Sequence, residues 1–236
     1  MESRREVPSA QRAPLVDRVS AALGAFPLGV YLVLHVVETW PALSGRMAFN
    51  ARLHTTTAPA WLALKAALVL LPLVVHGALG VRRALLSRRE APVEGALVVY
   101  ASRGLRTLQA VTGALTAAYL AVHLAELTVP FWRGGALEPM YETLSVRAGT
   151  PLSITLVSVG LAAVCFHAGQ GVPAALVTLG LVRREGQLLV ARVVVGLLAL
   201  AVWMALLDVT SHFAVGRALF GEETPAQPMG DQDPQD

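Results

Sequence analysis

Four histidines lie inside four long apolar stretches of the sequence, one in each stretch. They are His35, His76, His123 and His167. An imidazole in hydrocarbon is costly without a partner, so one histidine in each stretch indicates a shared role. Neutral imidazole is a common metal ligand, and we interpret the four as ligands of haem iron held between pairs of helices. Polar contacts between helices, or a proton relay, are the alternative interpretation.

The composition predicts a membrane protein. Of the 236 residues, 55% are hydrophobic and 15% are charged, whereas about a quarter of a soluble domain is charged. We expect five spans of about 20 residues, the length that crosses a bilayer. The spans cover residues 19–40, 60–81, 107–130, 151–182 and 188–213. The predicted fold class is an all-α transmembrane five-helix bundle over residues 19–215.

The arginines predict the orientation of this bundle. They concentrate before the first span, between the second and third spans, and between the fourth and fifth. The positive-inside rule then puts the N-terminus in the cytoplasm and the C-terminus outside. Residues 1–18 form a cytoplasmic segment, and residues 216–236 an acidic tail that we expect to be disordered. The net charge of +3 reflects topology and gives no sign of nucleic acid binding.

The depth of two histidines follows from their distance to a cytoplasmic arginine. His35 lies seventeen residues after Arg18, and His123 lies seventeen residues after Arg106. At about 1.5 Å per residue, each histidine is about 25 Å along its helix from the cytoplasmic side. The sequence therefore pairs His35 with His123 near the outer face.

The second pair follows by elimination and is less well supported by depth. His76 lies six residues before Arg82, near the cytoplasmic face. Its partner His167 lies sixteen residues before Arg183, which predicts a mid-membrane position unless the helix kinks or extends. The residues 169–173 include two glycines and a proline and predict such an interruption.

Two further groups of polar residues are candidates for the site. Those that begin the first and third spans could bind haem propionates or a quinone, although they could equally be membrane anchors and a helix cap: Arg18, Ser20, Arg106 and Gln109. The acids toward the outer face could exchange protons with a quinone, although they could equally be rim carboxylates: Glu38, Glu126 and Asp208. A pairing of Asp208 with Lys65 is a further alternative.

Four motifs, arriving in order, resemble those of a known family. They are RVSAALGAFPLGVYLVLH at 18–35, LPLVVH at 71–76, LQAVTG at 108–113 followed by His123, and GLAAVCFH at 160–167. Together they resemble the di-haem cytochrome b membrane subunit of succinate:quinone oxidoreductases, the class with one five-helix membrane subunit. The resemblance covers nearly all of residues 18–213.

The resemblance implies a function and a ligand set. The four histidines would be axial ligands of two b-type haems, with His35 and His123 on the distal haem and His76 and His167 on the proximal one. The partners would be a flavoprotein subunit and an iron–sulfur subunit at the cytoplasmic face of a bacterial inner membrane. Electrons would pass between succinate or fumarate and a quinone, with menaquinone expected.

Two other functions stay open from the sequence. One is the cytochrome b subunit of a formate dehydrogenase or a hydrogenase, which also uses histidines on few helices. The other is a membrane transporter with a histidine proton relay and no haem. Detection of haem separates the transporter from both cytochromes.

Overall fold

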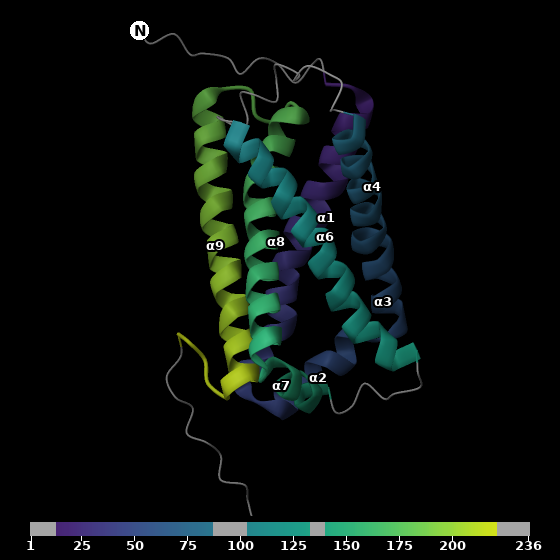
Figure 1. The fold of residues 1–236 in the computed structure, drawn as a ribbon, viewed down its shortest axis with the longest axis vertical. Helices are drawn as coiled ribbons and strands as arrows, with labels where there is room; N and C mark the ends of the chain where they lie inside the picture. The colour runs from purple at the N-terminus through teal and green to yellow at the C-terminus, as the bar shows by residue number, and fades with distance from the viewer. Residues whose placement is uncertain (1–12, 87–102, 133–139, 221–236) are drawn as a thin grey trace, which may run out of the picture.

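The computed structural model describes residues 13–86, 103–132 and 140–220. In these parts of the chain, five helical segments are long and apolar enough to cross a membrane (Figure 1). The segments are Leu15–Ser44, Pro59–Leu85, Gly104–Glu126, Pro151–Thr178 and Glu185–Val215. The expected all-α transmembrane five-helix bundle is confirmed, while its orientation stays a prediction. Residues 221–236 of the expected tail lie outside the described residues.

The spans are built from long helices and one composite helix. The long helices are α1 (Leu15–Thr39), α6 (Arg103–Trp132), α8 (Pro151–Thr178) and α9 (Glu185–Val215). The second span is α3 (Pro59–Lys65), a π-helical turn (Ala66–Leu70) and α4 (Leu71–Leu86). The connection expected between the first two spans contains a 3₁₀ helix (Trp40–Ser44) and α2 (Arg46–Thr56), and α7 (Met140–Ala148) precedes α8.

Local sequence signals explain where α8 and α9 begin and end. Thr150 precedes α8 and accepts a hydrogen bond from the Ser153 amide at 3.3 Å, so it caps the helix. Gly216 ends α9 in the left-handed conformation, with φ of 75°, which glycine adopts without strain. The expected interruption at residues 169–173 is not a break, because α8 continues through Pro173 to Thr178.

Helix α8 lies at the centre of the bundle. It contacts α1, α6 and α9, and α4 packs on α1. The main apolar core lies between α1, α8 and α9, and small residues of α8 let its neighbours approach closely. The buried members of this core are Leu28, Leu32, Leu161, Val164, Cys165, Ala168, Val202 and Leu206. Cys165 is a free, buried thiol that packs there as a small hydrophobe.

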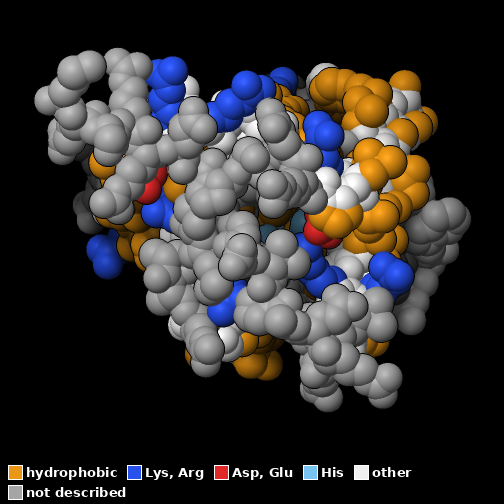
Figure 2. Space-filling model, turned by 90° about the horizontal axis from the view of Figure 1, so that it is seen from above, with side chains coloured by type: hydrophobic (Ala, Val, Ile, Leu, Met, Phe, Trp, Pro, Cys, Tyr) orange, Lys and Arg blue, Asp and Glu red, His pale blue; other side chains and the backbone are white. Residues whose placement is uncertain are grey.

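The two ends of the bundle differ. At the end where α1, α6 and α9 begin, arginine side chains gather around the surface (Figure 2), and Arg83 pairs with Asp17 at 2.8 Å. At the opposite end, α2 and α7 lie across the helix ends (Figure 1). There Phe49 packs edge-on against Phe213, with ring centroids 5.3 Å apart. This second apolar cluster fixes α2 and α7 on α9.

Polar contacts reinforce the end covered by α2 and α7. The Arg46 guanidinium donates to the Glu142 carboxylate at 2.9 Å, and this hydrogen bond lowers the pKa of Glu142. The Tyr141 hydroxyl lies 3.0 Å from His212 Nε2. Burial, aided by the nearby Glu142 carboxylate, raises the pKa of Tyr141. Tyr141 therefore stays a neutral hydrogen-bonding group that joins α7 to α9 at physiological pH.

Replacing Phe49 tests the apolar cluster at this end. Phe49 is 4% exposed, so Phe49→Ala leaves a cavity and should destabilise the protein by about 3 kcal/mol. Met47, two residues earlier on α2, is 85% exposed, and Met47→Ala should change little. The thermal midpoint of the detergent-purified protein measures both. Similar midpoints for the two variants would contradict the packing.

Candidate functional site

The structure brings the four histidines of the spans together as two pairs, and each of them is partly buried. His35 of α1 faces His123 of α6, with ring centroids 6.0 Å apart and ring planes at 84°. His76 of α4 faces His167 of α8, with centroids 6.4 Å apart and planes at 62°. Four different helices therefore supply two imidazole pairs, at two levels of the bundle.

Both histidines of the inner pair bind the backbone of a neighbouring helix. His76 Nδ1 lies 2.8 Å from the Ser20 carbonyl oxygen and 3.3 Å from the Ser20 hydroxyl. His167 Nδ1 lies 3.2 Å from the Gln109 carbonyl oxygen. Because a carbonyl only accepts, we assign the proton of each neutral ring to Nδ1. The lone pair of each Nε2 is then left for another partner.

The outer pair is held by stacked tyrosines. Tyr31 stacks on His35 with centroids 5.4 Å apart, and Tyr119 stacks on His123 with centroids 5.6 Å apart. The Tyr31 hydroxyl also lies 3.5 Å from His35 Nδ1. The sequence interpretation missed both tyrosines. Their signal is the repeated position, four residues before each outer histidine, which is one helical turn.

The geometry of the pairs fits an ion held between two imidazoles. Two metal–nitrogen bonds of about 2 Å would place the centroids of two facing rings about 6 Å apart. No group of three or more His, Cys, Asp or Glu side chains suited to a metal occurs among the described residues. Each pair thus offers two ligands and leaves the remaining coordination to another group. Haem meets this requirement, because its macrocycle supplies the equatorial nitrogens.

Orphaned polar atoms lie near the inner pair, on α6. Arg106 Nε and Gln109 Oε1 are buried and have no hydrogen-bond partner, while Gln109 Nε2 donates to the His167 carbonyl at 3.0 Å. A carboxylate would accept from Arg106 Nε–H, and a water or a hydroxyl would donate to Gln109 Oε1, so these atoms fit the expected propionate or quinone contacts. Arg18 differs, because its side chain is exposed. Ser20 lies against His76, as described above.

Similar orphans occur on α2 and were missed from the sequence. Asn50 Oδ1 and Arg52 Nε are buried without a partner. Nothing in the spacing of these two residues signalled this, because α2 itself was expected to be a loop. His54, also on α2, is exposed, as expected for a histidine outside the ligand set.

The three candidate acids are not brought together. Glu38 forms an ion pair with Lys65, whose Nζ lies 2.8 Å from Oε1 and also donates to the Thr56 carbonyl at 3.3 Å. The suggested pairing of Asp208 with Lys65 is therefore wrong. Asp208 is buried and accepts hydrogen bonds from the backbone amides of Leu219 and Phe220.

Glu126 is the exposed member of the three acids. It lies three residues after His123 on α6, and its backbone carbonyl accepts a hydrogen bond from Arg147 at 3.3 Å. Glu38 and Glu126 thus each lie three residues after an outer histidine. Asp208 instead binds the backbone of the segment that follows α9.

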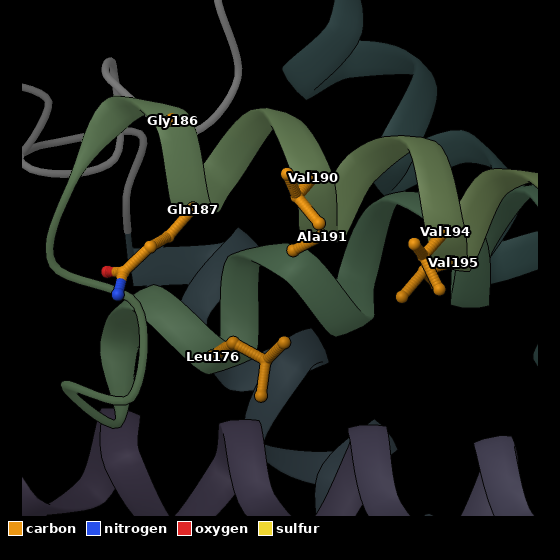
Figure 3. A pocket seen from close by; sticks show the side chains of 7 residues that line it. All are labelled: Leu176, Gly186, Gln187, Val190, Ala191, Val194 and Val195. Atoms are coloured by element: carbon orange, nitrogen blue, oxygen red, sulfur yellow. The ribbon is translucent and has the colours of Figure 1, made fainter.

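A groove between α8 and α9 lies apart from the histidine pairs. It encloses about 510 Å³ and is lined mainly by aliphatic side chains such as Leu176 and Val194 (Figure 3). The side-chain oxygen of Gln187, which also lines it, accepts the amides of Arg183 and Arg184. The groove contains none of the candidate residues and offers no reactive group.

Comparison with known proteins found a relative of similar sequence. The succinate dehydrogenase cytochrome b558 subunit of Bacillus subtilis (strain 168) is 28% identical to this chain over 165 residues. The match covers 70% of this chain and 79% of the relative. The chain resembles a succinate dehydrogenase cytochrome b. No family model and no solved structure matches it.

This comparison confirms the resemblance that the four sequence motifs predicted. A transmembrane cytochrome b of the succinate dehydrogenase type agrees with the five apolar helices. The roles of the individual residues remain predictions.

Replacing Lys65 tests the ion pair beside the outer histidines. The side chains of Lys65 and Glu38 are 24% and 12% exposed, so Lys65→Met leaves a largely buried acid unpaired and should lower the thermal midpoint by several degrees. Lys65→Met with Glu38→Gln should recover part of the loss. The matched control is Arg46→Met, which breaks an exposed pair and should change little. Equal losses in both single variants would contradict a buried role for Lys65.

Proposed function

We propose that this chain is the membrane anchor and electron-transfer subunit of a succinate:quinone oxidoreductase. The observation that carries the proposal is the two imidazole pairs, at two levels of one bundle, each with ring centroids 6.0–6.4 Å apart. The relative from Bacillus subtilis, named a cytochrome b558 subunit of succinate dehydrogenase, supports it. The name also supports b-type haem as the cofactor.

Two b haems would supply one-electron transfer at the two levels. His35 and His123 would bind the outer iron through their ring nitrogens, and His76 and His167 the inner iron. The carbonyls of Ser20 and Gln109 hold Nδ1–H of the inner ligands, which directs Nε2 to the metal and raises its basicity. The apolar helices around both pairs exclude water.

The partners and orientation follow from the same proposal. The arginines at the end where α1 begins put that end in the cytoplasm, with the N-terminus inside and the C-terminus outside (Figure 2). The inner pair is the one nearer this end, because His76 lies against Ser20 and Gly24 of α1. A flavoprotein and an iron–sulfur subunit bind that face. Arg106 and Gln109 on α6, together with Arg18 and Ser20 on α1, serve the propionates or a quinone. Electrons pass to a quinone, with menaquinone expected, in a bacterial inner membrane.

A haem count on the purified complex tests the proposal. The reduced-minus-oxidised spectrum should show two b haems per chain. The single variants His35→Ala and His76→Ala should each remove one haem and leave the other, because the two pairs share no residue. His54→Ala and His212→Ala, outside the pairs, should keep both.

The other functions give different results in this experiment. No haem in the unaltered complex would overturn the proposal and favour a histidine-relay transporter. Co-purification with a molybdenum or nickel protein, in place of a flavoprotein, would favour a formate dehydrogenase or a hydrogenase.

The acids at the outer level are proposed to exchange protons with the quinone. Glu38→Gln should slow quinone reduction by about tenfold or more while both haem spectra stay unchanged. Glu126→Gln and Asp208→Asn extend the test to the other two acids. Glu142→Gln is the control, because Glu142 is an ion-paired acid of the same end on α7. Unchanged quinone kinetics in Glu38→Gln would remove Glu38 from the site.

A further inference from the structure

Three glycines lie directly against aromatic rings, two against histidines of the inner pair and one against a tyrosine that stacks on the outer pair. We propose that Gly24, Gly113 and Gly160 are positioning residues, each serving one haem, and that they act through the rings that lie against them. Gly24 and Gly113 serve the inner haem, and Gly160 serves the outer one. This inference rests on the proposed function and adds residues to it.

Gly24 accommodates the ring of His76. A Cβ added at Gly24 would lie 2.5 Å from His76 Cε1, 2.6 Å from Nδ1 and 2.8 Å from Nε2. Three ring atoms lie within this range, so the imidazole rests directly on the backbone of α1. A methyl group there would displace the whole ring, including the nitrogen that we assign to the metal.

Gly113 accommodates the ring of His167 in the same way. An added Cβ would lie 2.8 Å from His167 Cε1 and 3.2 Å from Nδ1. In each case a carbonyl holds Nδ1 one helical turn before the glycine, at Ser20 for His76 and at Gln109 for His167. The ring is therefore fixed from two sides, by a carbonyl and by a backbone without a side chain.

This arrangement is repeated on two helices. Ser20 and Gly24 on α1 are four residues apart, as are Gln109 and Gly113 on α6, so each pair occupies one face. A new Cβ would tilt the ring. The ring would then lose its hydrogen bond to the carbonyl, and Nε2 would no longer point toward the metal. Groups that hydrogen-bond to a metal ligand influence metal binding, and losing one typically lowers the metal affinity about 10-fold to 100-fold.

Gly160 acts on the outer pair through Tyr119. An added Cβ at Gly160 would overlap the Tyr119 ring, with Cε2 at 2.7 Å and two other ring atoms closer. Tyr119 stacks on His123, with the ring planes 19° apart. Gly160 is buried in α8, so a Cβ there would push the Tyr119 ring aside and with it disturb the stacking on His123.

The chain supplies matched control glycines. Gly77 directly follows the ligand His76, and Gly80 lies one turn further along α4; a Cβ at either would meet nothing within 4 Å. An alanine at either position should also favour the helix slightly. Comparison with Gly24→Ala therefore distinguishes an effect of contact with the His76 ring from an effect of a substitution merely close to His76 in sequence.

The experiment measures haem in the complete complex carrying single substitutions. Gly24→Ala and Gly113→Ala should each lower the haem-to-protein ratio by about half, with the outer haem retained in spectrum and potential. Gly160→Ala should change the spectrum or potential of the outer haem alone. Gly77→Ala and Gly80→Ala should match the unaltered complex. The haem that remains in each variant reports that the bundle has folded.

The outcomes separate this inference from the proposed function. Two unchanged haems in Gly24→Ala and Gly113→Ala would overturn the inference, as would equal loss of both haems in the control variants. If Gly24→Ala fails to assemble, Gly113→Ala decides, because it acts on the ring of His167, the other ligand proposed for the same haem. A shifted inner potential with an unchanged outer one supports the positioning role, and no shift overturns it. Absence of haem from the unaltered complex would instead count against the proposed function.

Discussion

A histidine inside a membrane must satisfy its N–H group, and in this chain the backbone of a neighbouring helix does so for the inner pair. A helical carbonyl that already accepts its own i+4 amide keeps a second lone pair, so it can accept Nδ1–H without disrupting the helix. The imidazole must then approach the backbone within hydrogen-bond distance. Such an approach requires the residue one turn away to lack a side chain. The hydrogen bonds at Ser20 and Gln109 and the glycines beside them are consequences of one constraint.

This constraint also explains how the helices are arranged around the pairs. His76 rests on α1 where α4 packs against it, and His167 rests on α6 where α8 packs against it. Helices α1 and α6 each carry the same succession of carbonyl, glycine, tyrosine and histidine, toward the same end of the bundle. Helix α9 has no part in the pairs. It packs on α8 and completes the core that holds α1 in place.

The sequence predicted the spans from apolar length and the pairing of His35 with His123 from position along a helix, whereas it paired His76 with His167 by elimination and from the family resemblance. His167 was placed too deep because the count began at Arg183, whereas α8 ends at Thr178 and the residues between them do not form a helix. Helices α2 and α7 were not foreseen, since they are short and their stability depends on packing against α9. The ion pair of Lys65 with Glu38 joins residues 27 apart in the chain, and periodicity carries no information about such a contact.

Four of the seven buried side-chain atoms that lack a hydrogen-bond partner among the described residues form two similar sets. A guanidinium nitrogen and an amide oxygen lack partners on α6, at Arg106 and Gln109, and the same two kinds of atom lack partners on α2, at Asn50 and Arg52. Leaving a buried polar group unsatisfied costs about 1–3 kcal/mol. A haem carries carboxylates that can accept from a guanidinium, directly or through water, so a bound haem would offset this cost. Because Arg106 and Gln109 lie where α6 begins and α2 lies across the opposite end of the bundle, the two sets match the two levels at which the imidazoles are paired.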